Sequence, residues 1–124
     1  MGRTEPEKTD VLRGTLVLLV LRTLDLLGPL HGYAIGCRIE QISSGLLQLN
    51  QGTLYPALLE MEQEGWITSK WAMTENNRRA KFYAITSAGK KHLARITGEW
   101  KRMASTIERF LEPLKNTAEE RIIP

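Results

Sequence analysis

The stretch that decides the fold is residues 50–85, NQGTLYPALLEMEQEGWITSKWAMTENNRRAKFYAI. Its first half opens with small and polar residues and predicts a helix, with Asn50 as the candidate N-cap and Gly65 as the C-terminal stop. Its second half predicts two strands, 66–72 and 81–85, around the polar tip TENNRR. The stretch therefore predicts a short helix followed at once by a β-hairpin.

Two further helices are predicted before this stretch. A helix over about 11–27 follows Asp10, a plausible N-cap, and it is apolar on nearly every face, which implies burial on several sides. The break GPLHG at 28–32 separates it from a second helix over 33–43. The order helix, helix, helix, strand, strand is that of a winged helix-turn-helix. The predicted fold class is mainly α (α+β).

The start of the third predicted helix has side chains suited to contact nucleic acid. Its positive dipole end and free N–H groups favour phosphate, and Gly52 permits a close approach. Gln51 and Thr53 offer amide and hydroxyl groups for base edges or backbone. Tyr55 either lies against sugar and phosphate or packs in the core. The residues expected on the buried face are Leu54, Leu58, Leu59 and Met61.

The second half of the same helix has the opposite charge character. Glu60, Glu62 and Glu64 would be repelled by phosphate, so only the beginning of the helix can face DNA. Helix-turn-helix proteins enter the major groove by this end.

The predicted hairpin is basic. Between residues 70 and 81 four basic side chains stand against the single acidic Glu75. Such charges on a hairpin are also compatible with a merely solvated surface, but together with the preceding helix they favour DNA binding. The four are Lys70, Arg78, Arg79 and Lys81.

Composition sets limits without deciding the function. A chain of 124 residues corresponds to about one domain, and 42% hydrophobic with 25% charged residues is typical of a globular protein. The net charge of +3 is too small to indicate nucleic-acid binding by itself. The competing class is a winged-helix protein–protein interaction module without DNA binding, which would more often show an apolar patch at the start of the third helix.

A fourth helix is predicted after Thr86, a favourable N-cap. Apolar residues follow at alternating spacings of three and four, the a/d pattern of a coiled-coil seam, which requires a partner helix. We predict that the partner is the same helix of a second subunit, completed by the first helix; the alternative is that the seam packs on its own domain. The predicted interface is Leu93, Ile96, Trp100, Met103, Ile107 and Phe110 with Leu16 and Val20, and Pro113 interrupts the pattern before Leu114.

The predicted domain organisation has four parts. Residues 1–9 form a flexible N-terminal arm, 10–85 a winged-helix DNA-binding domain, 86–114 a long C-terminal dimerisation helix, and 115–124 a tail.

Other functional classes find little support. His31 and His92 are far apart, no Cys or carboxylate cluster has metal-ligand spacing, and no glycine-rich phosphate loop or nucleophile elbow is present, so neither an enzyme nor a metal or cofactor site is expected. The lone Cys37 and the polar N-terminus predict a cytoplasmic protein. The longest apolar run, 16–21, falls far short of the ~20 residues of a membrane span.

Four motifs together resemble the PadR family of winged-helix transcriptional repressors: RGTL at 13–16, GPLHGYAI at 28–35, QGTLYPALLEMEQEGWI at 51–67 and NNRRAKFYAITSAG at 76–89. The resemblance implies a homodimer, assembled through the first and last helices, that binds a partly palindromic operator in double-stranded DNA. By position it implies DNA contacts at Gln51, Gly52, Thr53, Tyr55, Arg78, Arg79 and Lys81, with Tyr33 as a candidate backbone contact.

The single C-terminal helix is similar to that of the short members of the family. In such members a tryptophan of the dimerisation helix can stack on a flat apolar molecule between the subunits. Trp100 occupies a corresponding position, so the resemblance leaves two roles open for it. It either anchors the interface alone or also binds a small aromatic effector.

Overall fold

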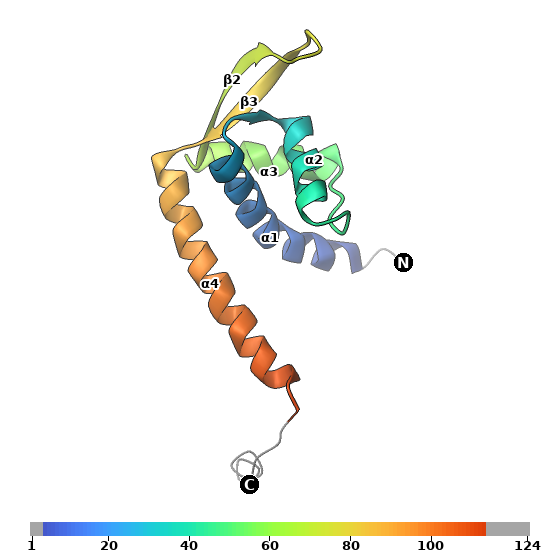
Figure 1. The fold of residues 1–124 in the computed structure, drawn as a ribbon, viewed down its shortest axis with the longest axis vertical. Coiled ribbons are helices and arrows are strands. Elements are labelled where there is room, and N and C mark those ends of the chain that lie inside the picture. Colours follow the sequence, from blue (N-terminus) through green and yellow to red (C-terminus); the bar gives the residue numbers. More distant parts are fainter. Residues whose placement is uncertain (1–3, 114–124) are drawn as a thin grey trace. The chain divides into compact units, whose positions relative to one another are not determined.

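The structure is a computed structural model that describes residues 4–113, with side chains from residue 14 onward (Figure 1). Its order of elements confirms the predicted winged helix-turn-helix with a long C-terminal helix. The elements are α1 (Thr4–Leu27), β1 (Leu30–His31), α2 (Gly32–Ile42), α3 (Gln51–Gln63), β2 (Ile67–Met73), β3 (Arg79–Ile85) and α4 (Ser87–Leu111).

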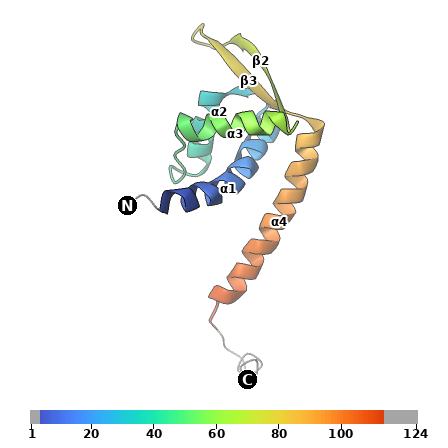
Figure 2. The same ribbon diagram turned by 180° about the vertical axis from the view of Figure 1, so that it is seen from behind.

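The chain divides into two units, residues 1–94 and 95–124. The first contains α1, α2, α3, the sheet and the first two turns of α4. In it the three helices pack together and the β2–β3 hairpin projects from them, as Figures 1 and 2 show from opposite sides. The second contains the remainder of α4. Among the described helices, none combines the length and the apolar character that a membrane span requires.

Helix α1 begins earlier than predicted. It starts at Thr4, so Asp10 lies inside the helix and is not its N-cap, and part of the predicted flexible arm 1–9 is helical. The physical reason is that Pro6 lies in the first turn, where a proline is tolerated because its missing N–H would have no partner. The predicted tail 115–124 and Leu114 lie outside the described residues.

One hydrophobic core joins α1, α2, α3 and the sheet. Leu16 and Val20 are fully buried in it, so the prediction that they belong to a dimer interface is corrected: the protomer's own core leaves them no surface for a second subunit. Full burial of such a side chain stabilises the fold by roughly 1.5–3 kcal/mol. On α3 the predicted buried face is found, except that Leu59 is exposed. The core also includes Leu21, Leu24, Ile35, Ile39, Leu54, Ala57, Leu58, Met61, Ile67 and Tyr83.

The ends of α2 and α3 are fixed by local hydrogen bonds. Asn50 caps α3 as predicted, since its Oδ1 accepts a hydrogen bond from the Thr53 N–H at 2.8 Å. Gly65 follows the helix with a φ of +83°, which ends it. His31 begins α2: its Nδ1 accepts from the Ala34 N–H at 3.4 Å, which gives this histidine a structural role.

The sheet has three antiparallel strands in the order β1-β3-β2. Strand β1, which pairs Leu30 with Tyr83, was not predicted, because two residues are too short to show a strand periodicity. Tyr83 is only 5% exposed, and it shares a face with Ile67 of β2. The face of the hairpin that carries Tyr83 and Ile67 is therefore the one that meets the core.

The start of α4 is joined to the end of α3 at one threonine. The Thr86 hydroxyl donates a hydrogen bond to the Gly65 carbonyl at 2.6 Å and accepts one from the Gly89 N–H at 3.0 Å, so Thr86 caps α4 as predicted. The Trp66 ring stacks on His92 with centroids 3.7 Å apart. Gly89 packs so closely that a Cβ there would overlap the Trp66 carbonyl oxygen and the Ile85 side chain.

The predicted seam residues of α4 divide into two groups. Leu93 is buried in the protomer, because the first turns of α4 pack on the base of the hairpin, so its assignment to a dimer interface is corrected. Ile96 is half-buried. The remaining four, Trp100, Met103, Ile107 and Phe110, are exposed and recur at the predicted helical spacing.

The close packing at Gly89 predicts that a side chain at this position destabilises the fold. Gly89→Ala should lower the free energy of unfolding by about 1–3 kcal/mol, because the added methyl group forces the helix start away from the hairpin. The matched control is Gly98→Ala on the same helix, where a Cβ would meet only the flexible Arg102 guanidinium. That variant should be neutral or more stable by up to about 1 kcal/mol. Urea unfolding of both variants checks this, and equal effects would contradict the packing argument.

Candidate nucleic-acid interface

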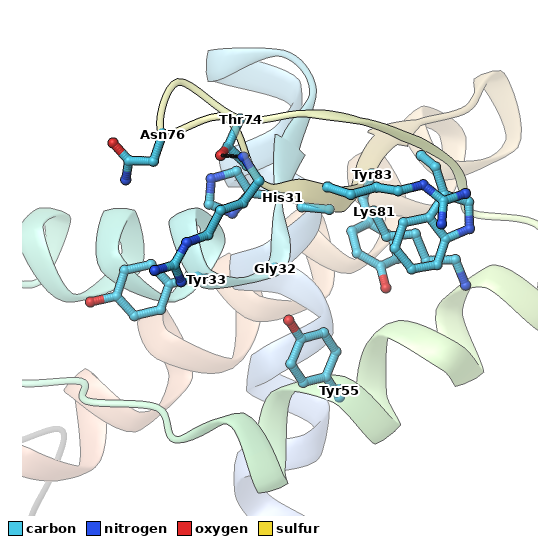
Figure 3. Close-up of a pocket in the computed structure, with 12 residues that line it drawn as sticks. His31, Gly32, Tyr33, Tyr55, Thr74, Asn76, Lys81 and Tyr83 are labelled. Carbon is cyan, nitrogen blue, oxygen red and sulfur yellow. Dashed lines mark hydrogen bonds between the residues drawn. The ribbon is translucent and has the colours of Figure 1, made fainter.

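An open pocket of about 710 Å³ lies between the first turn of α2, Tyr55 of α3 and the outer part of the hairpin (Figure 3). Aromatic and basic side chains predominate in its lining. Among the described residues no three His, Cys, Asp or Glu side chains are placed to share a metal ion. The lining comprises His31, Gly32, Tyr33, Tyr55, Trp71, Thr74, Asn76, Arg78, Arg79, Ala80, Lys81 and Tyr83.

The inner wall of the pocket depends on the contact between α2 and Tyr55. A Cβ at Gly32 would lie 2.7 Å from the Tyr55 Oη and 2.9 Å from two ring carbons, so a side chain there would displace the tyrosine. A side chain at position 32 can therefore be accommodated only if the Tyr55 ring moves away from the start of α2. Tyr55 remains 45% exposed beside Tyr33, so it lines the pocket and is not a core residue.

Tyr83 lies at the base of the pocket. Burial raises the pKa of its phenol above the ordinary value, and the nearby Tyr55 and Glu62 add to this shift. Glu62 in turn accepts a hydrogen bond from the Ser69 hydroxyl at 2.6 Å. This bond links α3 directly to β2 and holds the hairpin against the helix.

The pairing of β2 with β3 decides which basic residues face the pocket. Trp71 pairs with Lys81, and Met73 pairs with Arg79, so these residues share the face that carries Tyr83. Lys70 pairs with Phe82 and lies on the other face. Lys70, a predicted DNA contact, is therefore separated from the pocket.

The tip of the hairpin is an ordered turn. The Thr74 N–H donates to the Arg78 carbonyl at 2.7 Å, and the Thr74 hydroxyl accepts from the Arg78 N–H at 3.1 Å. Asn77 adopts the left-handed conformation with a φ of +62°, which asparagine tolerates. The ion pairs found in the described part of the chain, Arg22–Asp25 and Arg95–Glu99, involve no hairpin residue. The basic side chains at the tip thus keep their charge available for an anion.

The start of α3 is adjacent to the pocket but does not line it. Gly52 is exposed and Thr53 is half-buried. The Gln51 amide is turned toward Gly36 of α2, and its Oε1 is buried without a hydrogen-bond partner. Gln51 must change its side-chain conformation before this oxygen can reach anything outside the protein.

The structure brings together five of the predicted contacts and adds others that were not predicted, of which Trp71 lies closest to the basic side chains. Tyr33, Tyr55, Arg78, Arg79 and Lys81 line the pocket. Trp71 is 54% exposed and has the Arg79 guanidinium 4.5 Å and the Lys81 amine 6.0 Å from its ring centre. The sequence does contain a signal for this contact, because Trp71 lies in the first predicted strand of the hairpin and the basic residues Arg79 and Lys81 follow its tip.

These features define a winged-helix regulator, and the comparison with known proteins identifies its family. Residues 20–95 match the model of the transcriptional regulator PadR-like family, and the chain belongs to that family. The resemblance found in the sequence motifs is thereby confirmed, and the protein is a member of a family of transcriptional regulators, not of enzymes.

Solved structures of several regulators are similar to this chain. A transcriptional regulator from Clostridium thermocellum has 30% identity and a TM-score of 0.74 over 83% of this chain and 99% of that one. A PadR family regulator from Eggerthella lenta has 26% identity and a TM-score of 0.69 over 90% and 94%. Bacillus subtilis PadR in complex with operator DNA has 25% identity and a TM-score of 0.59 over 67% of this chain and 46% of that one.

Proposed function

We propose that the protein is a cytoplasmic, sequence-specific DNA-binding repressor that binds a palindromic operator as a homodimer. The observation that carries the proposal is the pocket itself, which lies next to the start of α3. Its basic side chains, Arg78, Arg79 and Lys81, form no ion pair within the described residues and lie beside partly exposed aromatic rings. The similarity to Bacillus subtilis PadR, which was solved with operator DNA, supports it.

In this proposal α3 enters the major groove by its N-terminal end. Thr53 and the exposed backbone at Gly52 lie at that end, whereas Glu60 and Glu64 are exposed at the other and would be repelled by phosphate. Gln51 takes part only after its amide turns outward from Gly36, which a base offering a hydrogen-bond donor would favour. The polarity of the helix therefore supports an approach by its N-terminal end.

The hairpin contacts the DNA beside the major groove. Arg78, Arg79 and Lys81 face the same space as Tyr33 and Tyr55, and a sugar-phosphate backbone combines the anionic and apolar surfaces that such a lining fits. The alternative, an interaction module without DNA binding, gives no role to the three basic side chains in this lining. Such side chains beside polar phenols favour a nucleic acid over a protein partner.

Dimerisation is proposed to use the outer part of α4. Trp100, Met103, Ile107 and Phe110 expose an apolar stripe at heptad spacing in the single chain, and such a stripe is stabilised by an identical helix. Two recognition helices related by twofold symmetry would then read half-sites about 34–36 Å apart.

A small aromatic effector is proposed to release the repressor at the same interface. Trp100 is 45% exposed on the stripe, so two copies near a twofold axis offer ring faces for a planar molecule. Release follows if the ligand prefers a dimer geometry with a different separation of the recognition helices.

The effector proposal predicts quenching of tryptophan fluorescence when planar aromatic compounds are titrated into the protein. Trp100→Leu should remove this response, whereas Trp66 and Trp71 remain as internal references. A response that survives in Trp100→Leu would place the ligand elsewhere, and no response to any planar compound would leave Trp100 as an interface anchor alone.

The DNA-binding proposal predicts the salt dependence of two variants. Operator DNA selected from a random pool should bind with a steep salt dependence, and Arg78→Ala and Arg79→Ala should each reduce the slope by about 0.9 per wing, or about 1.8 per dimer. Both should weaken binding to all sequences alike, because phosphate contacts carry no base information.

Lys70→Ala is the matched control, because Lys70 lies on the opposite face of the hairpin. It removes the same charge but should change the slope much less. A slope equally reduced by Lys70→Ala would mean that the pocket side is not the DNA side. Failure of the wild-type protein to select any DNA would favour the interaction module.

The dimer proposal predicts opposite results for two neighbouring substitutions on α4. Ile107→Glu places a charge on the apolar stripe and should raise the dimer dissociation constant at least about 100-fold. Ser105→Glu, at a position off the heptad seam, should leave it within a few fold. Sedimentation equilibrium measures both, and a wild-type monomer or an unaffected Ile107→Glu dimer would contradict the proposed interface.

A further inference from the structure

We infer that Trp71 is a positioning residue of the wing: its indole holds the Arg79 guanidinium on the pocket side of the hairpin, oriented for a DNA phosphate. The inference rests on the proposed DNA-binding function and adds a residue to it. Trp71 belongs to β2 and Arg79 to β3, and the antiparallel register places both on one face. The guanidinium carbon lies 4.5 Å from the centre of the indole.

Trp71 lies outside the buried part of the hairpin. The buried residues of this face are Ile67 and Tyr83, at the base of the hairpin, and Trp71 lies farther out with 54% of its surface exposed. About half of the indole surface is therefore available to neighbouring side chains and to solvent. Its main contacts with charged groups are with Arg79 and, at 6.0 Å, with Lys81.

In the proposed contact, the N–H donors of the Arg79 guanidinium stay free to bind a phosphate. A guanidinium on an aromatic ring uses its planar face, whereas its N–H donors point outward in the plane, where a phosphate oxygen is bound. In the described part of the chain no ion pair engages Arg79, so a carboxylate does not compete for these donors. The stacked side chain has also lost part of its rotamer freedom before DNA arrives, which lowers the entropy cost of the contact.

Arg78 provides an internal comparison. It precedes Arg79 in the chain and lines the same pocket, but it lies in the turn and has no ring contact with Trp71. If Trp71 acts by holding Arg79, its removal should matter only while Arg79 is present. The presence of Arg78 should make no difference to that effect.

The experiment is a pair of double-mutant cycles on operator DNA selected by the wild-type protein, with dissociation constants measured by fluorescence anisotropy. Trp71→Leu should weaken binding by about 5- to 30-fold, because an exposed cation–π contact changes an equilibrium roughly two- to fivefold and the dimer has two wings. Trp71→Phe keeps a ring face and should lose less. The loss from Trp71→Leu should vanish in an Arg79→Ala background and persist in an Arg78→Ala background.

A full loss in the Arg79→Ala background would overturn the inference, because Trp71 would then act on DNA directly or through the hairpin fold. If wild-type protein binds no DNA, the proposed function fails and the inference fails with it. If wild-type protein binds and Arg78→Ala lowers the salt slope, but the Trp71 and Arg79 effects are additive, only the inference fails.

A measurement on the free protein keeps the test valid if Trp71→Leu perturbs the hairpin. The indole ring current should shift the NMR signals of the Arg79 side-chain protons upfield in the wild type. The shift should be retained in Trp71→Phe, with a smaller magnitude, and absent in Trp71→Leu. Unshifted Arg79 signals in the wild-type protein would overturn the proposed contact without reference to DNA.

Discussion

The antiparallel register of β2 and β3 is the constraint on which the candidate interface depends. Tyr83 and Ile67 are anchored in the core at the base of the hairpin, and since side chains alternate along a strand, their burial fixes the side on which every outer residue lies. Arg79 and Lys81 reach the pocket for this reason, and Lys70 does not. A register shift of one residue would move Arg79 and Lys81 to the other face of the hairpin and Lys70 to the pocket face. Burial of Tyr83 and Ile67 therefore determines which basic side chains face the pocket.

Local signals made most of the fold predictable, because caps and breaks act within a few residues. Asn50, Gly65 and Thr86 were identified as helix boundaries from sequence, and each has the expected hydrogen bond or backbone conformation. The errors about the dimer interface arise from partners that are distant along the chain. Leu16 and Leu93 are apolar in the sequence whether they pack within the protomer or on a second subunit, and only the tertiary arrangement shows that both are buried in the protomer.

The residue types of the candidate site could be predicted from the sequence, but their arrangement could not. The residue types of the wing indicated an anion-binding surface, but the separation of Lys70 from Arg79, and the place of Trp71 beside it, depend on strand pairing. The role of Gly32 was likewise hidden, because a glycine in a turn motif does not indicate which ring crosses it. Gln51 has a residue type suited to base reading, yet its amide faces α2, where helix packing decides its conformation.

Thr86 shows how the segments on either side of the hairpin are joined. A single hydroxyl serves the Gly65 carbonyl just after α3 and the Gly89 N–H in the first turn of α4. Because the same atom makes both bonds, a shift of one helix end against the other breaks at least one of them. The Thr86 hydroxyl therefore couples the end of α3 to the start of α4, although the whole hairpin separates these two helix ends along the chain.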